Sequence, residues 1–130
     1  MSLKCNTGEY EGMDSDLGNV LYYSGSGSSM NTDPVNPNLT KGVKALRHSM
    51  SVKRPIRVIR SSAGKGAFAP SYGYRYDGLY TIESEDLERN KLGGVYLRFK
   101  LSRASNPASI DMSRPNRQER MAFARLKKMV

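Results

Sequence analysis

Cysteine and histidine are almost absent from this chain of 130 residues. Cys5 is the only cysteine, which excludes an intrachain disulfide and a cysteine-based zinc cluster and favours a reducing compartment. His48 is the only histidine, which excludes a site with several histidine ligands and constrains any Ser-His-Asp triad. We therefore expect no catalytic residues, no bound metal and no cofactor.

Long hydrophobic runs are also missing. No apolar stretch approaches the roughly 20 residues that a membrane-spanning helix needs, and the N-terminus through Tyr10 lacks the basic and apolar parts of a signal peptide. The chain has 38% hydrophobic and 25% charged residues, as a soluble globular domain does. We expect one domain over residues 1–130 and no membrane partner.

Acidic residues are absent between Asp33 and Asp77, in a chain whose formal net charge is +9. A basic surface neutralises phosphates and steers a polyanion toward itself, so a nucleic acid is the expected partner. Among these basic residues we take Arg60, Lys65 and Arg75 as candidate contacts to the DNA backbone. The alternative is that the charges are solvated on unrelated faces. The basic residues of the stretch are Lys41, Lys44, Arg47, Lys53, Arg54, Arg57, Arg60, Lys65 and Arg75.

Nucleotide-binding and metal-binding patterns are weak. The sequence Ala63-Gly64-Lys65-Gly66 lacks the spacing of a phosphate-binding loop, and no helical pattern follows it. Carboxylates clustered on loops usually face solvent, although they have the chemistry to hold magnesium for a nuclease. The two clusters of this kind are Asp14 with Asp16, and Glu83 with Glu85 and Asp86.

The local patterns predict an α+β fold. β-branched, aromatic and alternating residues predict strands over residues 20–24, 56–60, 79–83 and 95–101, with a polar connection over residues 84–92. Little helix lies between these strands. This favours a twisted, largely antiparallel sheet that curls toward a barrel, with one or two packed helices.

Two helices are expected. Leu39, Val43, Leu46 and Met50 recur at helical spacing, which predicts a helix that Asn38 caps and that ends near Met50. The Gly-, Ser-, Asn- and Pro-rich residues 24–38 before it are predicted to form a DNA-contacting loop. A second helix is predicted from residue 116, because a Glu three residues after an Asn forms a capping box.

Three blocks of the chain together resemble one known family. They are residues 18–27, Gly-Asn-Val-Leu-Tyr-Tyr-Ser-Gly-Ser-Gly; residues 39–50, which follow a Leu-x-x-Gly-Asn-x-Ala-Leu-x-x-Ser pattern with Val43 in place of Asn; and the group Ile56-Arg57-Val58-Ile59-Arg60, Phe68-Ala69-Pro70 and Tyr76-Asp77-Gly78-Leu79-Tyr80-Thr81. In this order they resemble the SRA (SET- and RING-associated, or YDG) domain. The resemblance implies a PUA-like barrel that binds methylated DNA in the nucleus.

The resemblance also implies a pocket for a flipped 5-methylcytosine. Tyr23 matches one of the two tyrosines that sandwich the base in the family, and Tyr10 matches the other with one extra residue before Asp14. Asp14 lies four residues before Gly18, as does the family's aspartate that accepts a hydrogen bond from the cytosine amine. Asp16 is the fallback for this role.

Residues after the second tyrosine complete the implied site. Backbone groups of Ser24 and Gly25 are expected to finish the reading of the base edge, and Ser26 and Gly27 to approach the DNA backbone. The compact loop resembles that of plant histone-methyltransferase members and lacks the Asn-Lys-Arg finger of animal ubiquitin-ligase members, so no preference for hemimethylated CpG is implied.

The Tyr76-Asp77-Gly78 signature is expected to serve structure. An Asp-Gly turn would enter the strand over residues 79–83, with Asp77 bonded to local backbone and Gly78 in an unusual φ.

The resemblance covers residues 8–103. Family domains begin well before the Tyr-x-x-Asp segment, so we expect the N-terminus to be incomplete, and residues 104–130 to form a C-terminal extension with a basic helix. The prediction is a non-catalytic reader of methylated cytosine whose partners are methylated double-stranded DNA and histone or chromatin proteins. The alternatives are the specificity domain of a modification-dependent restriction nuclease and a degenerate SRA-like interaction module.

Overall fold

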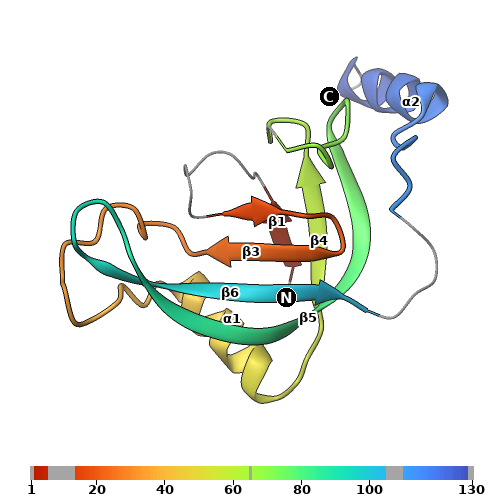
Figure 1. Ribbon diagram of the computed structural model, residues 1–130. Helices are drawn as coiled ribbons and strands as arrows, with labels where there is room; N and C mark the ends of the chain where they lie inside the picture. Colours follow the sequence, from red (N-terminus) through yellow and green to blue (C-terminus); the bar gives the residue numbers. More distant parts are fainter. Residues whose placement is uncertain (1, 6–13, 65, 105–109, 129–130) are drawn as a thin grey trace.

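The computed structural model describes residues 2–5, 14–64, 66–104 and 110–128 (Figure 1). Its strands form one six-stranded sheet in the order β1-β4-β5-β6-β3-β2. Each neighbouring pair is antiparallel except β1 with β4, so the predicted α+β fold on a largely antiparallel sheet is confirmed. The elements are β1 (Ser2–Cys5), β2 (Ser15–Asp16), β3 (Val20–Ser24), α1 (Lys41–Ser51), β4 (Ile56–Ser61), β5 (Tyr74–Arg89), β6 (Val95–Arg103) and α2 (Arg117–Lys128).

β5 is much longer than the sequence predicted, and Figure 1 shows it curving along β6. It runs from Tyr74 to Arg89, with a register shift against β6 between Ile82 and Ser84. The prediction of a connection over residues 84–92 is therefore wrong, and the chain reverses only after Arg89. The second half of β5 is mostly exposed, so its sequence lacks the apolar alternation that marks a half-buried strand.

The hydrophobic core lies where α1 packs against the sheet. Val43 and Leu46 of α1 are buried among side chains of β3, β4, β5 and β6. The predicted helix is confirmed, but Thr40 caps it instead of Asn38, and Thr40 Oγ1 accepts a hydrogen bond from the Val43 amide at 3.3 Å. The later start has a physical reason, because Leu39 is exposed and does not belong to the buried helix face.

The predicted terminal helix is confirmed as α2, which lies beyond the end of the sheet in Figure 1. Its capping box is formed: the Glu119 amide donates to Asn116 Oδ1 at 2.9 Å, and the Asn116 amide donates to Glu119 Oε1 at 3.1 Å. Phe123 meets Tyr72 edge to face, with 5.7 Å between ring centroids. Within the described ranges, no helix is long and apolar enough to cross a membrane.

Candidate nucleic-acid interface

Asp14, the predicted reader of the cytosine amine, lies next to β2 and is tied to the end of β3. Ser24 donates two hydrogen bonds to Asp14 Oδ1, from its backbone amide at 2.9 Å and from its hydroxyl at 2.6 Å. Ser24 is buried. We call this pair the Asp14–Ser24 corner. A carboxylate anchored in this way keeps a defined orientation, which hydrogen bonding to a base edge requires.

Glycines shape the loop that follows the Asp14–Ser24 corner. A side-chain carbon on Gly25 would lie 2.3 Å from Val43 Cγ2, so glycine lets the loop contact α1 closely. Ser28 donates to the Gly25 carbonyl from its amide at 3.2 Å and from its hydroxyl at 2.6 Å, and Gly27 has a φ of +81°. Ser26 is exposed. The segment predicted to approach the DNA backbone is thus a tight turn resting on α1.

Of the two tyrosines predicted to sandwich the base, only Tyr23 lies among the residues that the structure describes. Tyr23 of β3 is half-buried and packs against the hydrophobic core, and its cross-strand partner is Phe99. Tyr10 lies outside the described residues. The structure therefore places Ser24 against Asp14, whereas Tyr23 alternates to the core side of β3. The roles of residues 23–25 in base binding remain predictions.

Arg60 is buried, which corrects the prediction that it contacts the DNA backbone. It is 1% exposed. Its Nε and Nη2 donate to Asp16 Oδ2 and Oδ1 at 2.7 and 2.8 Å, and its Nη1 donates to Asp77 Oδ2 at 2.8 Å. Nη2 also donates to the Gly18 carbonyl at 2.8 Å and Nη1 to the Tyr80 hydroxyl at 3.1 Å. Burial alone would lower the pKa of Arg60, but the hydrogen bonds to Asp16 and Asp77 raise it, so Arg60 stays charged.

Asp77 holds a second buried arginine. Arg75 donates from Nε to Asp77 Oδ1 at 2.6 Å and from Nη2 to Oδ2 at 2.9 Å. Arg75 is buried, so its predicted contact to the DNA backbone is also corrected. The predicted Asp-Gly turn is wrong: Asp77 and Gly78 lie inside β5, Gly78 has a φ of +101°, and the Asp77 carboxylate bonds to arginines. The signature still has a structural role, because it places the anion between Arg60 and Arg75.

Asp16 and Gly18 belong to the same cluster. Asp16 Oδ1 also accepts the Gly18 amide at 2.9 Å, and the Asp16 side chain is only 2% exposed. Asp16 is therefore engaged by Arg60 and is not available to a base, which corrects its fallback assignment. Gly18 has a φ of +83°, and a side-chain carbon there would lie 2.7 Å from the Phe68 ring. This turn therefore requires glycine.

Other basic residues of the acid-free stretch lie on the surface. Lys41 and Lys44 of α1 are exposed on either side of the helix position that contacts Gly25. Arg47 pairs with Glu85 at 3.2 Å. Lys65, the third predicted backbone contact, lies outside the described residues. Further exposed residues of this kind are Lys53, Arg54 and Arg57.

Sequence reasoning missed three residues near the Asp14–Ser24 corner. Arg98 is the cross-strand partner of Ser24, and its guanidinium lies 4.3 Å from the centroid of the Tyr22 ring. Tyr96 is buried; burial raises the pKa of its hydroxyl, and the charge of Asp14 adds to the rise. The strand alternation that places Tyr22 and Ser24 on one face was the available signal.

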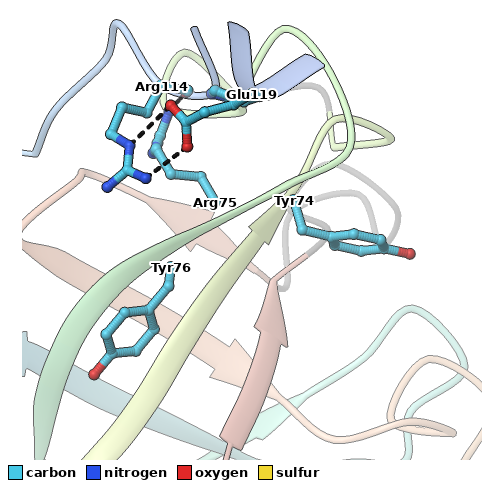
Figure 2. A pocket seen from close by; sticks show the side chains of 6 residues that line it. Tyr74, Arg75, Tyr76, Arg114 and Glu119 are labelled. Carbon is cyan, nitrogen blue, oxygen red and sulfur yellow. Dashed lines mark hydrogen bonds and ion pairs between the residues drawn. The ribbon is translucent and has the colours of Figure 1, made fainter. Parts of the chain in front are cut away.

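A groove of about 310 Å³ lies between β5 and the segment before α2 (Figure 2). Arg114 donates to Glu119 from Nε at 3.1 Å and from Nη2 at 2.6 Å, and these bonds, with the Asn116 amide, lower the pKa of Glu119 to about 2. In Figure 2, Tyr74 and Tyr76 point away from each other. Diverging rings do not form a stacking slot, so the groove joins the sheet to α2 and is not the candidate base site. Its lining residues are Tyr74, Arg75, Tyr76, Arg114, Pro115 and Glu119.

The comparisons with known proteins define the class. The family model described as the SAD/SRA domain matches residues 2–107, and the chain belongs to this family. The predicted family and its PUA-like α+β fold are thereby confirmed.

Particular relatives agree with this assignment. The Arabidopsis thaliana protein "Histone-lysine N-methyltransferase, H3 lysine-9 specific SUVH5" is 34% identical over 95 residues, which are 68% of this chain and 12% of that protein. The chain thus spans a small part of this curated relative. The crystal structure of a SUVH5 SRA complex with methylated CHH DNA has a TM-score of 0.65 at 32% identity, covering 85% of this chain and 67% of that one. A modification-dependent TagI restriction endonuclease has a TM-score of 0.64 at 28% identity, covering 81% of this chain and 38% of that one.

Proposed function

We propose that this chain is a non-catalytic DNA-binding module that reads methylated cytosine after flipping it out of the duplex. The observation that carries the proposal is the Asp14–Ser24 corner at the end of β3, the strand that also carries Tyr23. Membership in the SAD/SRA family and similarity to a SUVH5 SRA domain in complex with methylated DNA support it.

The proposed reading uses shape, stacking and one hydrogen bond of defined polarity. Flipping a base costs a few kcal/mol, and stacking on aromatic rings with hydrogen bonds to the base edge offsets that cost. Tyr23 supplies one stacking surface and Tyr10 the other. Asp14 accepts a hydrogen bond from the exocyclic amine of cytosine, a donor that thymine lacks. Backbone groups of Ser24 and Gly25 complete the edge readout.

The proposed contacts to the DNA backbone follow from what is exposed around the corner. The Gly25 loop contacts α1 at Val43, and Lys41 and Lys44 belong to the same helix. Both are exposed, whereas the buried Arg60 and Arg75 face carboxylates. Lys41 and Lys44 therefore replace the arginines as the proposed phosphate contacts.

A paired titration tests the proposal. Matched duplexes with and without 5-methylcytosine are titrated with the wild type and with Tyr23→Ala. Loss of stacking worth about 1–3 kcal/mol should weaken binding to methylated DNA roughly tenfold to hundredfold. Binding to unmethylated DNA should hardly change, because it depends on the backbone.

Tyr76→Ala is the matched control, because Tyr76 is the same residue type but is exposed on β5 in the groove that is not the candidate base site. It should leave the ratio of the two affinities unchanged. Equal binding of wild type to both duplexes would contradict the proposal.

The proposed setting is chromatin in the nucleus. Relatives named as histone-lysine methyltransferases support it, as does the similarity to an SRA–DNA complex. Within this setting we propose histone or chromatin proteins as additional partners, and we propose residues 1–130 as one SRA unit with residues 104–130 as its C-terminal extension.

A second candidate is the specificity domain of a modification-dependent restriction nuclease. The similarity to the TagI endonuclease favours it. In this case a separate cleavage domain would supply the metal chemistry. Among the side chains that the structure describes, no group of three or more His, Cys, Asp or Glu residues is placed to hold a metal ion. Magnesium-dependent cleavage of methylated plasmid by a protein in which this chain is joined to such a domain would favour the nuclease over the reader.

A further inference from the structure

The strand that leads from Asp14 is too short to fix its own position. β2 has two residues, which pair with β3 through Ser15–Tyr22 and Asp16–Leu21, and it is the last strand at its edge of the sheet. A strand of this length makes few ladder hydrogen bonds, and an edge strand has a partner on one side only. Side-chain contacts must therefore hold Asp14 in place.

Arg60 makes such contacts from the far side of the sheet. In the strand order, β5, β6 and β3 separate β4, which carries Arg60, from β2. The guanidinium nevertheless reaches both Asp16 oxygens and the Gly18 carbonyl, each at 2.7–2.8 Å. Tyr80 of β5 adds a hydrogen bond from its hydroxyl to the same Gly18 carbonyl at 2.6 Å. Arg60 thus closes the curled sheet at Asp16, which lies two residues along the chain from Asp14.

Asp77 holds Arg60 in this orientation. One Asp77 oxygen accepts a hydrogen bond from Arg60 Nη1 at 2.8 Å, and Arg75 donates hydrogen bonds to both Asp77 oxygens. We infer that Arg60, oriented by Asp77, is a positioning residue that sets Asp14 for base reading. The inference rests on the proposed function of Asp14. Contact with DNA is no part of this role, because Arg60 is buried.

The shape of the guanidinium is essential to this role. Arginine presents five donors in a rigid planar fork, whereas lysine presents one compact ammonium group. At position 60 an ammonium cannot reach Asp16, Asp77 and the Gly18 carbonyl together. Arg60→Lys therefore keeps the positive charge and loosens β2.

The experiment compares Arg60→Lys with Arg75→Lys. Both variants lose a fork that binds Asp77. Within the described part of the chain, the other hydrogen bonds of Arg75 go to the carbonyls of Phe68 and Arg114, and none goes to residues 14–18. For each variant, the melting temperature is measured first. The affinities for methylated and unmethylated duplexes are then measured at a temperature well below unfolding. Arg60→Lys should reduce the ratio of the two affinities about tenfold, as expected for one misaligned hydrogen bond. Arg75→Lys should lower the melting temperature similarly and keep the ratio.

A double-mutant cycle identifies the route of the effect. If Arg60 acts through Asp14, Arg60→Lys should not change the affinity ratio further in an Asp14→Ala background. Asp16→Asn, which keeps the shape of the side chain, serves in place of Arg60→Lys if the latter does not fold. A folded Arg60→Lys or Asp16→Asn variant with the wild-type ratio would overturn the inference alone. A wild type that does not distinguish the duplexes would overturn the proposed function and the inference with it.

Discussion

Asp77→Ala tests whether the family signature acts through a buried ionic cluster. The Asp77 side chain is 2% exposed, and it lies against Arg60 and Arg75, which are 1% and 4% exposed. Removing one partner of a buried ion pair leaves an uncompensated charge and costs about 3–5 kcal/mol. The free energy of unfolding of small domains is roughly 5–15 kcal/mol, so this variant should lose a large part of its stability.

The assay is urea denaturation followed by circular dichroism. Asp77→Asn, which keeps the shape without the charge, should fall between the wild type and Asp77→Ala. Asp86→Ala is the control, because Asp86 is an exposed aspartate on the same strand. If Asp77 only bonded local backbone in a turn, its replacement by Ala would lower the free energy of unfolding by about 1 kcal/mol. A loss of that size for Asp77→Ala, comparable to the control, would refute the ionic account.

Three further predictions concern the loop, the surface and α2. Gly25→Ala should destabilise the fold by about 1–3 kcal/mol, because the new carbon would lie 2.3 Å from Val43 Cγ2. In the double variant, Val43→Ala should recover part of that loss, and additive losses in a denaturation series would contradict the clash. Lys41→Ala and Lys44→Ala should each weaken binding to all duplexes alike and reduce the salt slope by about one unit, and an unchanged slope would remove these lysines from the interface. The pKa of Glu119 is lowered from 4.5 to about 2 in the folded chain, so its support of the α2 cap should be fully present above pH 4.5 and lost as the pH falls through about 2; an NMR titration of the Glu119 carboxyl with a midpoint near 4.5 would contradict the capping box.

Local sequence signals predicted those parts of the fold whose side chains report their surroundings. The strand over residues 20–24 and the capping box of Asn116 and Glu119 appear as predicted, because alternation and capping chemistry act over a few neighbouring residues. The second half of β5 could not be predicted in this way. Its side chains are mostly exposed, and its pairing with β6 is a tertiary choice.

The burial of Arg60 was predictable in principle. Ile56, Val58 and Arg60 alternate, and the structure buries all three on one face of β4. Strand periodicity therefore placed Arg60 inside, whereas its charge alone suggested a surface contact. What the sequence did not provide was the partner, since Asp16 lies 44 residues away and meets Arg60 only when the sheet curls.

The candidate site followed from the family resemblance more than from local physics. Tyr23 and Asp14 are ordinary residues in an ordinary strand context, and spacing against the family motif singled them out. The structure adds that Ser24 donates to the Asp14 carboxylate from both its amide and its hydroxyl. No local pattern predicts this contact across ten residues.

Base flipping is the central claim, and fluorescence reports it most directly. A fluorescent base analogue placed beside the 5-methylcytosine loses its stacking neighbour when that base leaves the helix, so its emission should rise when wild-type protein binds. The rise should be absent with unmethylated duplex and strongly reduced for Tyr23→Ala and Asp14→Ala, while Tyr76→Ala should behave as wild type. Binding of methylated duplex by wild type without any change in emission would contradict the account.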